Sequence, residues 1–175
     1  MKARLLELSS LVELEGIADD ARTISLGSSA QSPRRFYVLE IVSHGGQQTV
    51  VKLQCSHHGI RPSWIFSEHA GAIAIGFDAS IAFVNITRER EAVVRPLDGV
   101  FYEFVNQPDV DYVLVLHELG VAEFDFSGCE RWSVSTPDIT ESAQVQEDGL
   151  LVVHHQGSQK KLIVEIGTGR IVPAM

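Results

Sequence analysis

Cysteine is scarce in this sequence, with only Cys55 and Cys129 among 175 residues. The two stand in no short paired spacing, which excludes a disulfide framework or a four-ligand zinc site as the basis of the fold. No stretch approaches the roughly 20 apolar residues that a membrane helix needs. Glu7 also comes before any apolar run long enough for a signal peptide. We therefore expect a cytoplasmic protein.

Basic residues are also few, with 14 Lys and Arg against 23 Asp and Glu, for a net charge of −9. Such a field repels phosphate backbones and anionic membrane surfaces. Basic residues gather only in pairs, and no aromatic stacking platform surrounds them. The sequence thus predicts neither a nucleic acid nor a membrane as a partner.

Motifs of catalysis and cofactor binding are missing as well. The chain contains no Gly-x-Ser-x-Gly elbow, on which hydrolases carry a nucleophile. The glycines around Thr168 lie between two expected strands and lack the following helix that would hold a phosphate. We predict no catalytic residue, no cofactor and no metal site, and we favour a non-enzymatic protein.

Short alternating apolar runs occur almost throughout, for example at residues 72–75, 112–116 and 150–153, each bounded by Gly, Asp or Pro. Such runs are typical of β-strands. With 45% hydrophobic and 21% charged residues, the composition is that of a globular protein, and we expect one all-β domain over residues 1–175. Residues 3–15 fit either a helix or strands, and we favour strands.

The strand pattern repeats every 40 residues. Segments 81–86, 121–126 and 161–166 align without a gap and share three apolar columns and one polar column. The apolar columns are Ala82/Ala122/Leu162, Val84/Phe124/Val164 and Ile86/Phe126/Ile166. The polar column is Asn85/Asp125/Glu165. This alternation predicts strands with one buried face and one solvated face.

The strand before each of these segments also repeats, and the two strands form a hairpin. Ile73, Val113 and Val153 keep the same step, and short turns follow at residues 78–79, 118–119 and 158–159. Within one period we count four strands, over residues 91–97, 100–105, 112–117 and 120–126. We therefore divide the chain into three repeats and a degenerate N-terminal unit. The unit spans residues 1–49, and the repeats span 50–90, 91–130 and 131–172.

The run from Ala122 to Gly128, the following Arg131-Trp132 and the later segment 164–169 resemble the hairpin and outer strand of quinoprotein-type or WD40-type propeller repeats. The resemblance covers about 120 residues and implies a β-propeller built from four-stranded blades. The first copy departs from this pattern. Its turn, Thr87-Arg88, lacks the glycine, and Ala92 stands where Trp132 does in the second copy. Quinoprotein dehydrogenases need about twice as many blades, so the resemblance gives no support to their chemistry.

Propellers close with four to eight blades, whereas this chain holds three copies and one degenerate unit. We predict a small, about four-bladed, or a partial β-propeller, and a β-sandwich or barrel is the alternative. If the ring closes, the segment Arg170–Val172 would pair with N-terminal strands. If it stays open, its edges need cover from another chain or from the N-terminal segment.

Two groups of side chains are candidates for function. Imidazole is a good ligand for zinc or copper, and the histidines nearest to expected strand ends are His117, His154 and His155. Aromatic residues dominate protein–protein contacts. The aromatic candidates for a partner surface are Trp64, Phe101, Tyr102 and Trp132.

Three hypotheses for function follow. The first is a non-enzymatic protein-interaction module on the repeat-built scaffold. The second is a small-molecule or metal-binding protein that uses His and Glu residues at strand ends. The third is a partial propeller that assembles with itself. The expected partner is accordingly a protein or a second copy of the chain.

Overall fold

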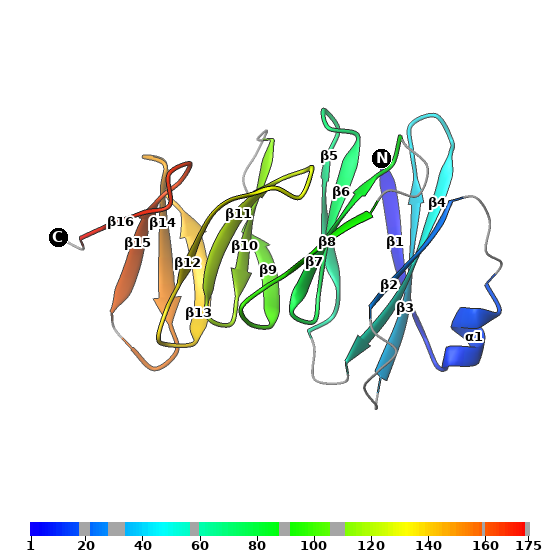
Figure 1. Cartoon of the computed structure of the whole chain (residues 1–175), viewed down its shortest axis with the longest axis horizontal. Helices are drawn as coiled ribbons and strands as arrows, with labels where there is room; N and C mark the ends of the chain where they lie inside the picture. The colour runs from blue at the N-terminus through cyan, green and yellow to red at the C-terminus, as the bar shows by residue number, and fades with distance from the viewer. Residues whose placement is uncertain are drawn as a thin grey trace.

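The structure, a computed structural model, describes residues 1–17, 22–27, 34–56, 60–87, 92–105, 111–158 and 160–173. Its strands form four four-stranded sheets. The sheets lie side by side in a row along the longest axis of the molecule, in chain order from the N-terminal end to the C-terminal end (Figure 1). The two termini therefore lie at opposite ends of the row.

The first sheet has the strand order β1-β3-β4-β2. Its strands are β1 (Lys2–Leu8), β2 (Thr23–Gly27), β3 (Arg34–Val42) and β4 (Gln48–Ser56). Strand β2 runs parallel to β4, so this sheet is not an up-and-down copy of the others. We expected a repeat to begin near residue 50. That expectation is wrong, because β4 pairs with β3 along its whole length and completes the first sheet.

Residues 3–15 contain both a strand and a helix. Strand β1 is as expected, but residues 11–15 form the helix α1 (Leu11–Glu15). The Ser10 side chain accepts the Glu13 backbone N–H at 3.3 Å, and the Glu13 carboxylate accepts the Ser9 N–H at 2.8 Å. The first bond satisfies a donor that the first helical turn leaves open, and the second ties the residue before the cap to the helix. In the part of the chain that the structure describes, no helix is long and apolar enough to cross a membrane.

The other three sheets are antiparallel and follow the chain strand by strand. The second sheet comprises β5 (Ser63–Ser67), β6 (Ala72–Phe77), β7 (Ser80–Asn85) and β8 (Ala92–Pro96). The third comprises β9 (Phe101–Val105), β10 (Tyr112–His117), β11 (Gly120–Asp125) and β12 (Glu130–Ser135). The fourth comprises β13 (Thr140–Val145), β14 (Leu150–His155), β15 (Lys161–Glu165) and β16 (Arg170–Val172).

The sheets are displaced by one strand from the sequence repeats. Strand β8 pairs with β7, so the repeat expected at 91–130 begins with the strand that completes the preceding sheet. Likewise, β12 completes the third sheet. Strand β16 pairs with β15 and is the edge of the fourth sheet. Among the described residues it has no pairing with the N-terminal strands, so the ring closure considered for Arg170–Val172 does not occur.

The 40-residue step places equivalent residues in equivalent strands. Val84, Phe124 and Val164 lie in the third strands of successive sheets and are at most 1% exposed. Val84 lies opposite Ile73, and Phe124 lies opposite Val113. These three residues therefore occupy corresponding positions in the three sheets.

The last hairpin departs from this step. Val164 lies opposite Leu151 rather than Val153, which is a slip of two residues. Strand β14 ends at His155 and β15 begins at Lys161. The turn expected at residues 158–159 falls in this connection, and Gln159 lies outside the described residues. Because side chains alternate with period 2, a slip of two keeps every residue on its face. Leu151 thus occupies the place that the sequence assigned to Val153.

The residues of the polar column accept hydrogen bonds within turns instead of lining a solvated face. Asn85 accepts the N–H of Thr87 at 3.0 Å, Asp125 accepts the N–H of Ser127 at 2.8 Å, and Glu165 accepts the Thr168 hydroxyl at 2.7 Å. Burial would raise the pKa of Asp125, but hydrogen bonds from Ser127 and Cys129 outweigh it and lower that pKa. Both faces of β7 and β11 are buried, so the expected solvated face is absent from these strands.

Three apolar clusters fill the three gaps between neighbouring sheets. In the middle gap, for example, the rings of Phe83 and Phe124 lie 5.6 Å apart between centroids. Hydrogen bonds at hairpin ends add to this packing. The Asp78 carboxylate accepts the Ser56 N–H at 2.9 Å, and its carbonyl accepts the Phe101 N–H at 2.6 Å. Asp78, at a positive φ of 46° that aspartate tolerates better than most residues, therefore connects three sheets.

Candidate functional site

The four aromatic candidates lie in the gaps between sheets. Phe101 and Trp132 are buried, at 1% and 9% exposure, and so belong to the core rather than to a contact surface. Trp64 packs against the cluster between the first two sheets, and Tyr102 against the cluster between the last two. Both are only partly buried. The structure therefore does not bring the four together on one surface.

The three histidine candidates are also separated. His117 lies on the β10 face that carries Val115, in the gap between the second and third sheets. His155 lies on the β14 face that carries Val153, in the next gap, and His154 lies on the opposite face of β14. Within the described ranges, no three His, Cys, Asp or Glu side chains come together as a metal site.

His117 and His155 have similar environments in their separate gaps. Each is buried, and the Nδ1 atom of each has no hydrogen-bond partner. Burial lowers the pKa of His117, although Asp98 and Glu130 act in the opposite direction. Thr140 connects the two strands, since it lies opposite His155 and its hydroxyl donates to the His117 carbonyl at 2.6 Å. Both histidines therefore act as core residues of the sheet stack.

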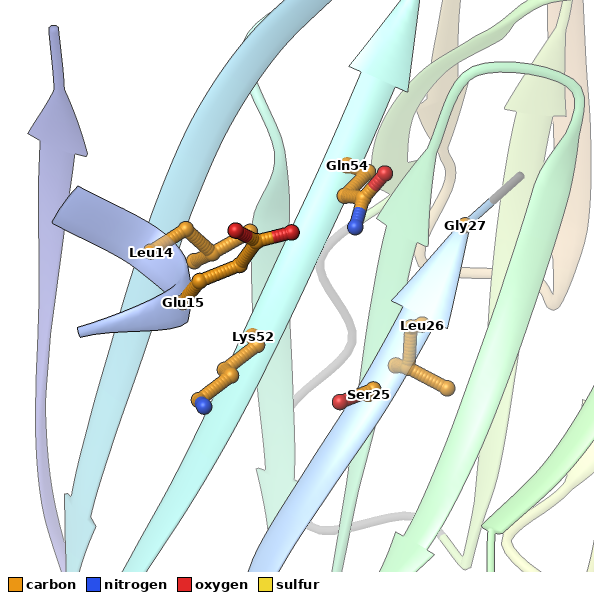
Figure 2. A pocket seen from close by; sticks show the side chains of 7 residues that line it. All are labelled: Leu14, Glu15, Ser25, Leu26, Gly27, Lys52 and Gln54. Atoms are coloured by element: carbon orange, nitrogen blue, oxygen red, sulfur yellow. The ribbon is translucent and has the colours of Figure 1, made fainter. Parts of the chain in front are cut away.

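A polar pocket of about 210 Å³ lies between α1 and the outward face of the first sheet. Figure 2 shows Lys52 and Gln54 on β4 between the α1 side chains and Ser25 on β2. The pocket is lined by Leu14, Glu15, Ser25, Leu26, Gly27, Lys52 and Gln54. Gly27 has a φ of 96°, and a Cβ there would lie 2.1 Å from the Gln54 carbonyl oxygen, so only glycine fits.

Lys52 holds the helix onto the sheet. It is 7% exposed, and its Nζ donates to the carbonyl of Ile17, just past the end of α1, at 2.6 Å. Leu14, the buried residue of α1, contacts the same face. Gln54 in turn accepts from Arg34 at 3.1 Å. These contacts show that α1 covers part of the outward face of the first sheet.

The third and fourth sheets are joined by a buried carboxylate. Glu123 is 0% exposed and stands where the second and fourth sheets carry Phe83 and Ile163. It accepts from Arg131 at 2.9 Å, from the Trp132 indole at 3.0 Å and from the Gly167 N–H at 3.3 Å. Because Gly167 follows β15, this carboxylate connects the two sheets directly.

A shallow groove of about 390 Å³ runs between the first strands of these two sheets. It is lined by Glu103, Phe104, Val105, Ala143, Gln144 and Val145. Glu103 and Gln144 are exposed, and the apolar residues between them are half-buried or buried. The described residues that line the groove offer one carboxylate and one amide.

The outward face of the fourth sheet completes the set of candidate surfaces. Cross-strand pairing places one residue from each strand in a middle row: Gln144, Val152, Ile163 and Val172. The corresponding row of the third sheet is Val105, Leu114, Glu123 and Trp132. That of the second sheet is Ile65, Ala74, Phe83 and Val93.

These three rows differ in what covers them. The rows of the second and third sheets belong to the clusters of the following gaps, or pack against them. The fourth sheet lies at the C-terminal end of the molecule (Figure 1). Its middle row alternates with Leu151, Val153 and Val164, which pack in the last gap, and so lies on the face away from the other sheets. Within the part of the chain that the structure describes, no element packs on it. Val152, Ile163 and Val172 are partly exposed as a result.

Four-stranded antiparallel sheets, stacked face to face in chain order with equivalent rows in each gap, define a partial β-propeller. Solved structures agree with this class. The dihydro-heme d1 dehydrogenase NirN, in complex with DHE, superposes with a TM-score of 0.56 at 8% sequence identity. The alignment covers 80% of this chain and 34% of NirN, so the chain spans about a third of that protein's length.

A protein of unknown function from Bacteroides caccae superposes with a TM-score of 0.44 at 12% identity, over 87% of this chain and 59% of that one. No protein-family model and no curated protein sequence matches the chain. The fold is therefore shown by the sheets and by the likeness to NirN, and the function is argued below from the residues of this chain.

Proposed function

We propose that the chain is a non-enzymatic protein-interaction module and that the outward face of its fourth sheet is the docking surface. The observation that carries the proposal is the uncovered middle row, whose equivalents are buried in the third sheet and buried or partly buried in the second. Burial of apolar surface contributes about 25 cal/mol per Å². A partner that covered Val152, Ile163 and Val172 would bury apolar surface there. It would thereby gain the kind of free energy that packing between neighbouring sheets provides elsewhere in the molecule.

The placement of the histidines and aromatic residues supports binding rather than catalysis. His117 and His155 are separated by the third sheet, and Phe101 and Trp132 pack between sheets. These side chains stabilise the scaffold. The outward face of the fourth sheet therefore remains available for recognition. The cytoplasmic location and the lack of nucleic-acid or membrane partners, expected from the sequence, remain part of the proposal.

The proposal is tested by photo-crosslinking in living cells. A benzophenone amino acid at position 163 lies on the outward face, whereas one at position 171 lies on the other face of the same sheet. Ile171 is 57% exposed, so the control position is at least as accessible to solvent. We expect a discrete protein adduct from position 163 only. No adduct from position 163, or the same adducts from both positions, would contradict the proposal.

A further inference from the structure

The outward face of the fourth sheet has three cross-strand rows with different character. The middle row carries the apolar residues Val152, Ile163 and Val172. One flanking row contains Ser142, His154 and Lys161. The other flanking row contains Leu150, Glu165 and Arg170. The two flanking rows therefore place Lys161 and Glu165 at equal distances along β15 from Ile163.

We infer that the occupant of this face is a second copy of the chain, related by a two-fold axis near Ile163. The inference rests on the proposed docking surface and names its partner. A two-fold axis that lies in the plane of the contact and runs across β15 at Ile163 brings the two faces together and sets β15 antiparallel to β15 of the other copy. Lys161 of one copy then faces Glu165 of the other, and the apolar middle rows meet at the axis. The charge pattern is complementary to itself, as an isologous contact requires.

The other end of the molecule argues against a head-to-tail stack. Such a stack would place the fourth sheet of one copy on the first sheet of the next. Part of the outward face of the first sheet is already covered by α1, whose Leu14 is buried and whose end is held by Lys52. A two-fold contact uses only the uncovered face and gives a closed pair.

The charges on this face suit the rim of such a contact. Glu165 pairs with Arg170 in its own chain, at 3.2 Å, and its pKa is lowered by hydrogen bonding from Thr168 and by Arg170. The carboxylate is thus ionised and fixed in position beside the apolar row. Lys161 is exposed and extends from the same strand. Its ammonium group therefore meets an ordered carboxylate on the second copy.

The first experiment measures the mass of the purified chain by sedimentation equilibrium over a range of concentrations. We expect a concentration-dependent approach to twice the 19.2 kDa chain mass. Ile163→Lys should weaken association by at least roughly a hundredfold, since it places two charges in the apolar centre of the contact. The matched change Ile171→Lys, on the other face, should leave the association constant unchanged.

The second experiment tests the register. Lys161→Glu places two like-charged pairs in the contact, and Glu165→Lys does the same with the opposite sign, so each variant alone should associate roughly tenfold more weakly. An equimolar mixture restores both opposite-charge pairs and should form the mixed dimer with near wild-type affinity. Because Glu165→Lys also alters its own turn, the melting temperature of each variant is measured alongside. The Lys161→Glu deficit should shrink with added salt, which screens exposed charges.

The outcomes separate this inference from the proposed function. A monomer at every concentration, a dimer that Ile163→Lys leaves intact, or no recovery in the mixture would overturn the two-fold contact. If the purified chain is monomeric while position 163 still gives an adduct with a different protein in cells, the docking surface stands and the second copy does not. If both experiments fail, the proposed function fails with the inference.

Discussion

The two ends of the row of sheets are finished differently. At the N-terminal end, α1 packs on the first sheet and Lys52 donates to the carbonyl of Ile17. At the C-terminal end, the apolar row through Val152 and Ile163 lies on the face opposite to the one that packs in the last gap. Neighbouring sheets cover both faces of an internal sheet, whereas the outward face of an end sheet is covered only if a separate element packs on it. The comparison shows that this chain provides that element at one end.

Among the changes that test this comparison, Leu14→Ala should cause the largest loss of stability. Leu14 is 2% exposed, and truncation of a buried leucine costs about 3 kcal/mol. Ile163→Ala at the other end should cost less, about 1 kcal/mol, because that side chain is only partly buried in the single chain. Urea unfolding, at a concentration where the chain is monomeric, measures both. Equal costs would show that the two outward faces are covered alike.

Glu123→Ala tests how strongly the fourth sheet is held to the third. The change leaves the Trp132 indole and the Gly167 N–H without their acceptor, which costs about 2 kcal/mol. Hydrogen exchange should become faster in β14 and β15 while the first sheet keeps its protection. Glu103→Ala, an exposed carboxylate in the same sheet, is the control. Equal acceleration in the first and fourth sheets would mean that Glu123 stabilises the whole chain rather than this joint.

The strands themselves were predictable from the sequence because their signal is local. Alternation of β-branched and aromatic residues located β10 and β11 to within a residue, and the 40-residue step identified their equivalents. Sheet boundaries depend instead on pairing between distant segments. The assignment of β8 to the second sheet therefore needed the structure. So did the slip of two residues in the last hairpin, since Leu151 and Val153 are both apolar and share a face.

The candidate sites were harder to predict for the same reason. The aromatic residues were candidates for a partner surface because aromatic side chains dominate protein–protein contacts, whereas stacking buries Phe101 and Trp132 between sheets. Two signals were present and were missed. The series Phe83, Glu123 and Ile163 contains one carboxylate among apolar residues, which indicates a buried polar contact. The series Ser10-Leu11-Val12-Glu13 has the spacing of a capping box.

Ser10→Ala tests how much the cap on α1 matters to the N-terminal end. The change removes the side-chain acceptor of the Glu13 N–H and should cost about 1 kcal/mol. Ser10→Asn, which keeps an acceptor, should be close to wild type. Urea unfolding measures the loss, and hydrogen exchange should place it in α1. A loss shared by both variants would mean that the position, rather than the hydrogen bond, is responsible.

The smallest expected effect lies between the two ends, at His117. Burial lowers the pKa of this imidazole in the folded chain from its usual 6.5. The unfolded chain then binds more protons between the two pKa values, so stability rises with pH through that window. The contribution is complete above about pH 6.5 and is lost as the pH falls toward the lowered value.

His117→Phe should remove this dependence, because the equivalent position in the second sheet is the buried Phe77. Urea unfolding between pH 5 and pH 7.5, a range chosen to lie above the usual pKa values of Asp and Glu, should give a flatter profile for the variant than for the wild type. His154→Phe, on the outward face of the fourth sheet, is the matched control and should keep the wild-type slope. If the control flattens the profile instead, the acid-sensitive group lies at the uncovered end, and the difference between the two ends includes their response to pH.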